Sequence, residues 1–364
     1  MKSKDDVQRG LGVLHKNRDH MFCYESWLRE GTLFDYLEIK PEMLAILPKL
    51  IEQVTKKIGD EYFTGGKLVG VDETYFDFDY GNEPEFNVSK ILELSRGGYF
   101  DKACEFLLND PSCEDQREFL YNRGVTDEDI LENKLGSSKY VSDEYKDLLG
   151  LSVHPMTRRY LGGEEVTGVM IPFMWNGEVI ALTTRAVPFD FMKFSTTAPD
   201  LTLGNRDEAY REDLNELWVV EGKFDQMALN RIGIDGVLFL NSASPSVLQL
   251  GSILSHVLRT GKRLVLALDS DNAGMRSMLL FGTLAQDVGI DVRYVLLLGG
   301  KDHAEAVIKY GFGIREYGDF MYSDVNHLKS LVRLDSEPDI VEYDDYVKKR
   351  KEINVNFKDG EPGC

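Results

Sequence analysis

Five acidic residues stand close behind short apolar runs in the second half of the chain. They are Glu221, Asp225, Asp269, Asp271 and Asp302. Carboxylates that gather in one place repel each other unless a cation neutralises them. Carboxylate oxygens are the ligands that suit Mg²⁺ or Mn²⁺, and these ions keep bound water and also bind substrate phosphates. The chemistry that this set of residues suggests is metal-dependent phosphoryl transfer.

The apolar runs lie at 217–220, 236–240, 263–268 and 292–298. Helix-length stretches of roughly 10 to 18 residues separate them, and this alternation predicts a parallel sheet covered on both faces. Ligands of such sheets bind at the carboxyl ends of the strands, so we expect the five acids to meet at one edge. Two metal ions held there would polarise a phosphoryl group and activate an attacking oxygen.

Each motif taken alone has a simpler explanation. Acids are common in the first turn of a helix, so Glu221 and Asp225 alone are typical of a solvated helix start. The pair Asp269 and Asp271 is equally typical of a helix N-cap. The agreement of three strand ends in order and spacing favours the metal site. His303, beside Asp302, could bind metal, but we expect a surface histidine at a helix start.

Local signals also organise the chain before these runs. Residues 1–110 have mostly helical apolar spacing. A helix should end at Gly124, and Thr126 should cap the next one. Residues 166–186 predict a hairpin, because two β-rich runs flank the turn sequence Asn176-Gly177.

Charge and cysteine content limit the class of protein. The net charge of −20 counts against a nucleic-acid binder, although local basic patches coexist with an acidic total. The sequence has no apolar run of about 18 residues and no secretory signal, so we expect no membrane span. Its four cysteines form no C-x-x-C pair, so we expect no zinc and a reducing, cytoplasmic setting.

The order E-G-x-x-D, D-x-D-x-A-G and G-x-D, each after a strand, resembles the TOPRIM domain, which DnaG-type primases, type IA and II topoisomerases and some nucleases share. The resemblance matches Glu221, Asp269 and Asp271 to the acidic triad of that family. Asp225 and Asp302 match its supporting acids. Primases often have another acid where this chain has Ala304.

The segment before these motifs resembles the primase core. The stretch 116–135 is similar to an element in which a helix ends at Arg-Gly and an acidic turn follows, and 169–194 is similar to the hairpin region before the primase TOPRIM domain. By this resemblance a basic wall would contact the template or the triphosphate. Its candidate residues are Arg123, Arg185, Lys193, Arg206 and Lys223, although single basic residues on a hairpin are often only surface residues.

The resemblance implies an α/β (α+β overall) fold in four parts. These are a mostly helical region at 1–110, a mixed α/β primase-core subdomain at 111–211, a TOPRIM parallel sheet flanked by helices at 212–313, and an acidic segment at 314–364. We expect no counterpart of the zinc-binding domain of larger primases, since His154 and four dispersed cysteines cannot form one, and none of their helicase domain, since the sequence has no G-x-x-x-x-G-K-[ST] motif. A stand-alone core of this kind resembles phage-encoded primases, which would act in the host cytoplasm.

The function that the resemblance implies is synthesis of short RNA primers on single-stranded DNA with two or more Mg²⁺ or Mn²⁺ ions. The expected partners are the template, ribonucleoside triphosphates and a replicative helicase or separate accessory protein. Two alternatives stay open. One is a TOPRIM-type nuclease, in which water replaces the attacking hydroxyl, and the other is a catalytically degenerate, primase-like interaction protein.

Overall fold

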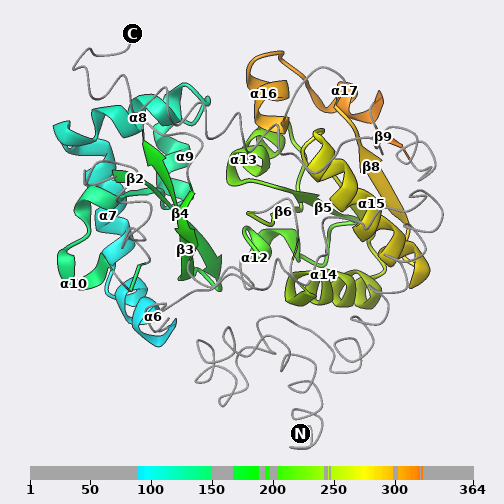
Figure 1. Cartoon of the computed structure of the whole chain (residues 1–364), viewed down its shortest axis with the longest axis horizontal. Helices are drawn as coiled ribbons and strands as arrows, with labels where there is room; N and C mark the ends of the chain where they lie inside the picture. The colour runs from blue at the N-terminus through cyan, green and yellow to red at the C-terminus, as the bar shows by residue number, and fades with distance from the viewer. Residues whose placement is uncertain are drawn as a thin grey trace, which may run out of the picture.

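The computed structural model describes residues 88–146, 148–149, 167–187, 193–196, 203–241, 245, 247–297, 302–319 and 321–322. The predictions for residues 1–87 and for the acidic end from 323 onward lie outside this part of the chain. We call residues 88–196 the first subdomain and residues 203–322 the second subdomain. Figure 1 shows them side by side, with the first in cyan and green and the second in green to orange.

The first subdomain is a four-stranded antiparallel sheet with helices packed on it. The strands pair in the order β1-β2-β3-β4. They are β1 (Gly136–Ser137), β2 (Thr167–Trp175), β3 (Glu178–Val187) and β4 (Lys193–Thr196). The helices are α6 (Val88–Arg96), α7 (Tyr99–Asn109), α8 (Glu114–Tyr121), α9 (Asp127–Glu132) and α10 (Asp143–Lys146), with short 3₁₀ turns at Pro111–Cys113 and Ser138–Tyr140.

The predicted hairpin is confirmed as β2 and β3. Asn176 and Gly177 have φ values of 51° and 76°, so both central residues of the turn lie in the left-handed region. That geometry is a type I′ turn, whose twist matches that of the two strands. Asn and Gly adopt positive φ at the lowest cost, which explains why the sequence alone located this turn.

The predicted helix boundary at Gly124 is also confirmed. Gly124 has φ of 71°, its N–H bonds Tyr121 O, and the N–H of Val125 bonds Leu120 O. These two bonds form the Schellman motif, which closes a helix with a left-handed residue. Thr126 then starts α9 with a capping box, in which its hydroxyl and the Asp129 carboxylate each accept the other residue's backbone N–H.

The second subdomain contains the predicted parallel sheet. Strands β5 (Glu216–Val220), β6 (Val237–Phe239), β7 (Arg263–Leu266) and β8 (Val292–Val295) run parallel, in the order β6-β5-β7-β8. A short strand, β9 (Met321–Tyr322), extends the β8 edge in the antiparallel direction. The helices are α12 (Arg206–Ala209), α13 (Lys223–Arg231), α14 (Val247–Thr260), α15 (Asn272–Asp287), α16 (His303–Ile308) and α17 (Ile314–Asp319).

Alternating strand residues supply two different cores, one on each face of the parallel sheet. Leu264 and Leu266 face the core built with α14 and α15, whereas Val265 and Ala267 face the core that includes residues of α13 and α16. Successive side chains of a strand point to opposite faces, so apolar residues at every position indicate a sheet buried on both sides. The predicted α/β fold class is therefore confirmed.

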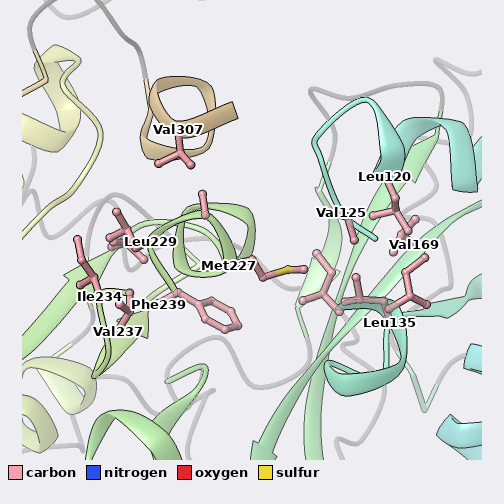
Figure 2. Close-up of a cluster of buried hydrophobic side chains, with 14 of the residues drawn as sticks. Leu120, Val125, Leu135, Val169, Met227, Leu229, Ile234, Val237, Phe239 and Val307 are labelled. Carbon is pink, nitrogen blue, oxygen red and sulfur yellow. The ribbon is translucent and has the colours of Figure 1, made fainter. Parts of the chain in front are cut away.

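A continuous apolar core joins the two subdomains. It combines Leu120, Val125 and Val169 of the first subdomain with residues of the second, and Figure 2 shows Met227 pointing from α13 toward the first subdomain. Phe173 of β2 also packs on Phe239 of β6, with ring centroids 5.2 Å apart. The sheet and helices that bear the acids are thus packed against the antiparallel sheet.

The division expected at residue 110 does not separate two packing units among the described residues. Helix α7 packs on β1 and helix α6 on β3, so the helices at 88–109 lie on the first sheet. Within the ranges that the structure describes, no helix has the length and apolarity needed to cross a membrane.

Candidate acidic active site

The carboxyl ends of β5 and β7, the two central neighbours of the parallel sheet, present the acidic residues. Glu221 follows β5 directly, and Asp269 and Asp271 lie in the turn between β7 and α15. Asp302 immediately precedes α16 and is its N-cap. Because parallel strands end at the same edge, the fold brings these acids from three separate loops to one side of the sheet.

The other four acids all act on the pKa of Asp269. Burial raises the pKa of its carboxyl to about 9, and the negative charges of Asp225, Glu221, Asp302 and Asp271 act in the same direction, in that order. Its Oδ1 is buried and makes no hydrogen bond within the described part of the chain. A buried carboxylate oxygen with no donor is costly unless a proton or a cation satisfies it.

The position of Asp269 depends on Gly274. A Cβ atom on Gly274 would lie 2.2 Å from the backbone oxygen of Asp269, closer than any two such atoms approach. Only glycine therefore allows the first turn of α15 to pack against the strand end that bears the acid.

Asp225 is buried and holds two backbone N–H groups. Its Oδ2 accepts from Gly222 N at 3.1 Å, and its Oδ1 accepts from Ala304 N at 3.0 Å. Burial is the largest cause that raises its pKa to about 7, and the charge of Asp302 adds to it. Asp225 therefore links the turn after Glu221 to the first turn of α16.

Asp271 and Asp302 are helix caps as well as members of the acidic group. Asp271 Oδ1 accepts from Gly274 N at 2.9 Å, and Asp302 Oδ1 accepts from Glu305 N at 2.7 Å. Each of these bonds occupies one carboxylate oxygen. Among the residues that the structure describes, no three His, Cys, Asp or Glu side chains are arranged closely enough to hold a metal ion.

Ser270, between the two acids of the β7 turn, has a structural partner that the sequence did not indicate. Its Oγ accepts a hydrogen bond from the N–H of Leu297 at 2.8 Å. This bond ties the turn after β7 to the end of β8, the strand that leads toward Asp302. A serine hydroxyl is able to satisfy a backbone N–H in this way, whereas alanine is not.

The structure brings only some of the expected basic residues together. Arg185 of β3 and Lys193 of β4 are direct partners in the antiparallel register. The guanidinium of Arg123 lies 3.9 Å from the centre of the Phe119 ring and 5.6 Å from that of Phe224 on α13, so it sits at the junction of the subdomains.

Two other basic candidates are buried, which does not fit the expected contact with a polynucleotide. Lys223 is 8% exposed, and its ammonium group donates to Asn133 Oδ1 at 2.6 Å and to Gln226 Oε1 at 2.5 Å. Burial lowers its pKa to about 7. Arg206 is 3% exposed and lies over the ring of Tyr210 at 5.0 Å. The structure gives both side chains a packing role instead.

The expectation of a surface histidine at position 303 is wrong. His303 is completely buried, and its Nδ1 lies in a hydrogen bond of 3.0 Å with the hydroxyl of Tyr317 on α17. Burial lowers the pKa of the imidazole to about 4. The spacing of His303 with Ala306 and Val307, both buried, is the helical pattern that could have indicated an inward face. Nothing in the sequence pointed to Tyr317.

Comparison with known proteins shows that all five acids lie in a segment that matches a known domain family. Residues 218–307 match the Toprim-like family. A DNA primase of Rickettsia prowazekii (strain Madrid E) is 24% identical over 253 residues, which are 63% of this chain and 40% of that protein. The chain thus spans less than half the length of the curated relative that it matches.

Solved structures show the same fold. The RNA polymerase domain of Mycobacterium tuberculosis primase DnaG is 14% identical, with a TM-score of 0.50, over 74% of this chain and 98% of that one. The same domain in complex with a double-stranded DNA oligomer with a 6-nucleotide overhang is 16% identical, with a TM-score of 0.50, over 72% and 96%. At these identities the likeness establishes the arrangement of both sheets and leaves the chemistry to the residues themselves.

Proposed function

We propose that this chain, which contains a Toprim-like domain at residues 218–307, is a DNA primase that makes short RNA primers on single-stranded DNA. The observation that carries the proposal is the buried, unbonded Oδ1 of Asp269 among four further carboxylates. The likeness to a DNA primase supports this choice over a nuclease.

The acidic group fits divalent metal ions in its chemistry, and its carboxylates would have to draw closer together than they lie in the described residues to share one. The group consists only of carboxylate oxygens, which suit Mg²⁺ or Mn²⁺ rather than zinc. Glu221, Asp269 and Asp271 would hold the ions, with Asp302 beside them. Bound there, such ions would neutralise charge on the transferring phosphate and favour ionisation of the attacking hydroxyl.

The reaction needs little covalent chemistry from the protein. The 3′-hydroxyl oxygen of one ribonucleotide forms a bond to the α-phosphorus of the next, and the bond from that phosphorus to pyrophosphate breaks. Glu221, which follows β5 directly, would accept the hydroxyl proton or hold metal. Asp269 must lose its own proton first, because its raised pKa keeps the carboxyl neutral near pH 7.

Template and nucleotides would be held by basic side chains of the first subdomain. Arg185 and Lys193 are the strongest candidates, because the register makes them direct neighbours on β3 and β4. Two basic residues at paired positions of the sheet would neutralise neighbouring phosphates and so compensate locally for the acidic net charge. A replicative helicase or accessory protein as partner, and a cytoplasmic location, belong to the same proposal.

Primer synthesis on random single-stranded DNA with Mn²⁺ and labelled ribonucleotides tests the proposal. Asp269→Asn keeps the shape of the side chain and should lower dinucleotide synthesis by well over 100-fold, beyond the roughly 10- to 100-fold typical of groups that only support a metal ligand. The matched control is Asp235→Asn, at an exposed site before the amino end of β6 and so at the opposite edge of the sheet.

Two results would overturn the proposal. One is the absence of template-dependent product from the wild-type chain under these conditions. The other is wild-type synthesis by Asp269→Asn. Cleavage of labelled DNA or RNA by the wild-type chain without nucleotides would identify a nuclease instead.

A further inference from the structure

His303 and Tyr317 form a buried polar pair next to Asp302, and neither belongs to the group of five acids. His303 follows Asp302 in the chain, and its ring is stacked on Tyr317 with centroids 5.6 Å apart. The hydrogen bond between the imidazole Nδ1 and the tyrosine hydroxyl is 3.0 Å long. Both side chains are almost fully excluded from solvent, so neither is available to bind substrate.

The pair borders both segments that carry the central acids. The backbone of Ala267 and Leu268, the two residues before Asp269, lies close enough to the imidazole to influence its charge, although Nε2 makes no hydrogen bond of normal geometry. On the other side, the charges of Asp225 and Asp302 act on the hydroxyl of Tyr317. The imidazole of His303, at the start of α16, therefore lies near the end of β7, and the ring of Tyr317 is stacked on it.

Apolar side chains in place of His303 and Tyr317 would hold α16 and α17 together with a smaller desolvation free energy. Burying an imidazole and a phenol requires both to be hydrogen-bonded, and an unsatisfied nitrogen remains even so. A directional bond, unlike apolar contact, fixes the rotation of the two rings. The side of α16 that carries His303 is thereby fixed against α17, and Asp302 is the residue immediately before it.

We propose that His303 and Tyr317 are positioning residues for the acidic site. Their hydrogen bond holds the start of α16, and with it the Asp302 turn, against α17, so that Asp302 is positioned to share divalent cations with the other acids. This inference rests on the metal-binding part of the proposed function. It concerns the geometry of the ligands and does not require that the chain makes primers.

Mn²⁺ titration of the full chain without nucleotides, followed by the paramagnetic resonance of free Mn²⁺, tests the pair directly. Tyr317→Phe removes one hydroxyl and keeps the ring. It should weaken Mn²⁺ binding by roughly 10- to 100-fold, the effect typical of groups that orient metal ligands. The control is Tyr294→Phe, because Tyr294 is an equally buried tyrosine of β8 in the opposite core, with its hydroxyl against Gly282. That variant should bind Mn²⁺ as the wild type does.

A double-mutant cycle separates positioning from general packing. If the hydrogen bond is what matters, His303→Phe combined with Tyr317→Phe should lose little more Mn²⁺ affinity than either single variant. His303→Asn, which keeps a polar nitrogen or oxygen near the position of Nδ1, should recover part of the loss seen in His303→Phe. A circular dichroism melt of each variant identifies any that fails to fold, and His303→Leu, which also lacks a polar atom, replaces His303→Phe in the cycle if that variant does not fold.

The outcomes distinguish this inference from the proposed function. Wild-type Mn²⁺ affinity in both Tyr317→Phe and His303→Phe would overturn the positioning role while leaving the proposed primer synthesis untouched. A wild-type chain that binds Mn²⁺ and makes no primers would sink the proposed function and leave the pair's role standing. Equal losses of Mn²⁺ affinity in Tyr317→Phe and Tyr294→Phe would also refute the positioning role, because they would reflect loosened packing in either core and not the loss of the His303–Tyr317 bond.

Discussion

The N–H of Ala304 donates to Oδ1 of Asp225 over 3.0 Å, across a separation of 79 residues in the chain. The same carboxylate accepts the N–H of Gly222 through its other oxygen. One buried acid thus connects the loop that carries Glu221 with the loop that carries Asp302. Asp225 acts on the site through these backbone bonds, whether or not it also contacts metal.

Asp225→Asn should separate this connection from metal ligation. The amide keeps one accepting oxygen, but its NH₂ group would face a backbone N–H, so one of the two bonds is lost. We expect primer synthesis to fall by roughly 10- to 100-fold. The free energy of unfolding should change by less than about 3 kcal/mol, the upper cost of one unsatisfied buried group. Urea unfolding and primer assays check both numbers, with Asp235→Asn as control. Unchanged synthesis would show that the connection is dispensable.

Metal binding should release protons near neutral pH. The pKa of Asp269 is about 9 and that of Asp225 about 7, so part of the acidic group is protonated before metal binds. A metal ion requires the ionised form, and its apparent affinity should therefore rise from pH 6 to pH 9. Calorimetry of Mn²⁺ binding in buffers of different ionisation enthalpy counts the released protons. Asp269→Asn should release fewer, and a wild-type affinity that is flat over this range would contradict the prediction.

The metal-free fold should lose stability as the pH rises. In the folded chain the pKa of Asp269 lies above its ordinary unfolded value of about 3.9, so between these values the folded state binds more protons. The stability from this group is complete below about pH 4 and is lost as the pH rises toward 9, by at most about 1.4 kcal/mol per pH unit. Lys223 has a lowered pKa and contributes the opposite slope from about pH 7 upward.

Comparison with Asp269→Asn isolates the carboxyl, because both chains keep Lys223. The difference in unfolding free energy between wild type and variant should move in favour of the variant from pH 5 to pH 9 in EDTA. Urea titrations at each pH measure this difference. A difference independent of pH would mean that Asp269 titrates normally in the fold.

The basic residues should divide into two groups by salt dependence. Lys223→Met leaves the Asn133 and Gln226 oxygens without a donor and should cost about 1 to 3 kcal/mol of stability. The amine is buried, so the salt dependence of binding to single-stranded DNA should not change.

Arg185→Gln should instead reduce the slope of log affinity against log salt by about 0.7, the value for one phosphate contact on a single strand. Fluorescence anisotropy at several salt concentrations measures the slopes. Equal slopes for Arg185→Gln and wild type would remove Arg185 from the interface.

Much of the local structure could be predicted from short stretches of sequence. The Asn176-Gly177 turn, the Gly124 helix end and the Thr126 cap each depend on the backbone preferences of one or two residues. The parallel strands were visible because apolar residues at every position mark a sheet buried on both faces. The order of the acids at strand ends followed from the same alternation of elements.

Tertiary structure alone decided the partners of Asp225, Lys223 and His303. Asp225 and Ala304 are 79 residues apart, and Lys223 and Asn133 are 90 residues apart, so no local pattern could reveal either bond. Helical spacing could have indicated that His303 faces inward, but its hydrogen bond to Tyr317 depends on how α17 packs on α16. The sequence determined which residues reach the edge of the sheet, because strand and turn preferences are local. Which of them are buried, bonded or left with an unpaired oxygen depends on how distant segments pack, because desolvation is a property of the whole fold.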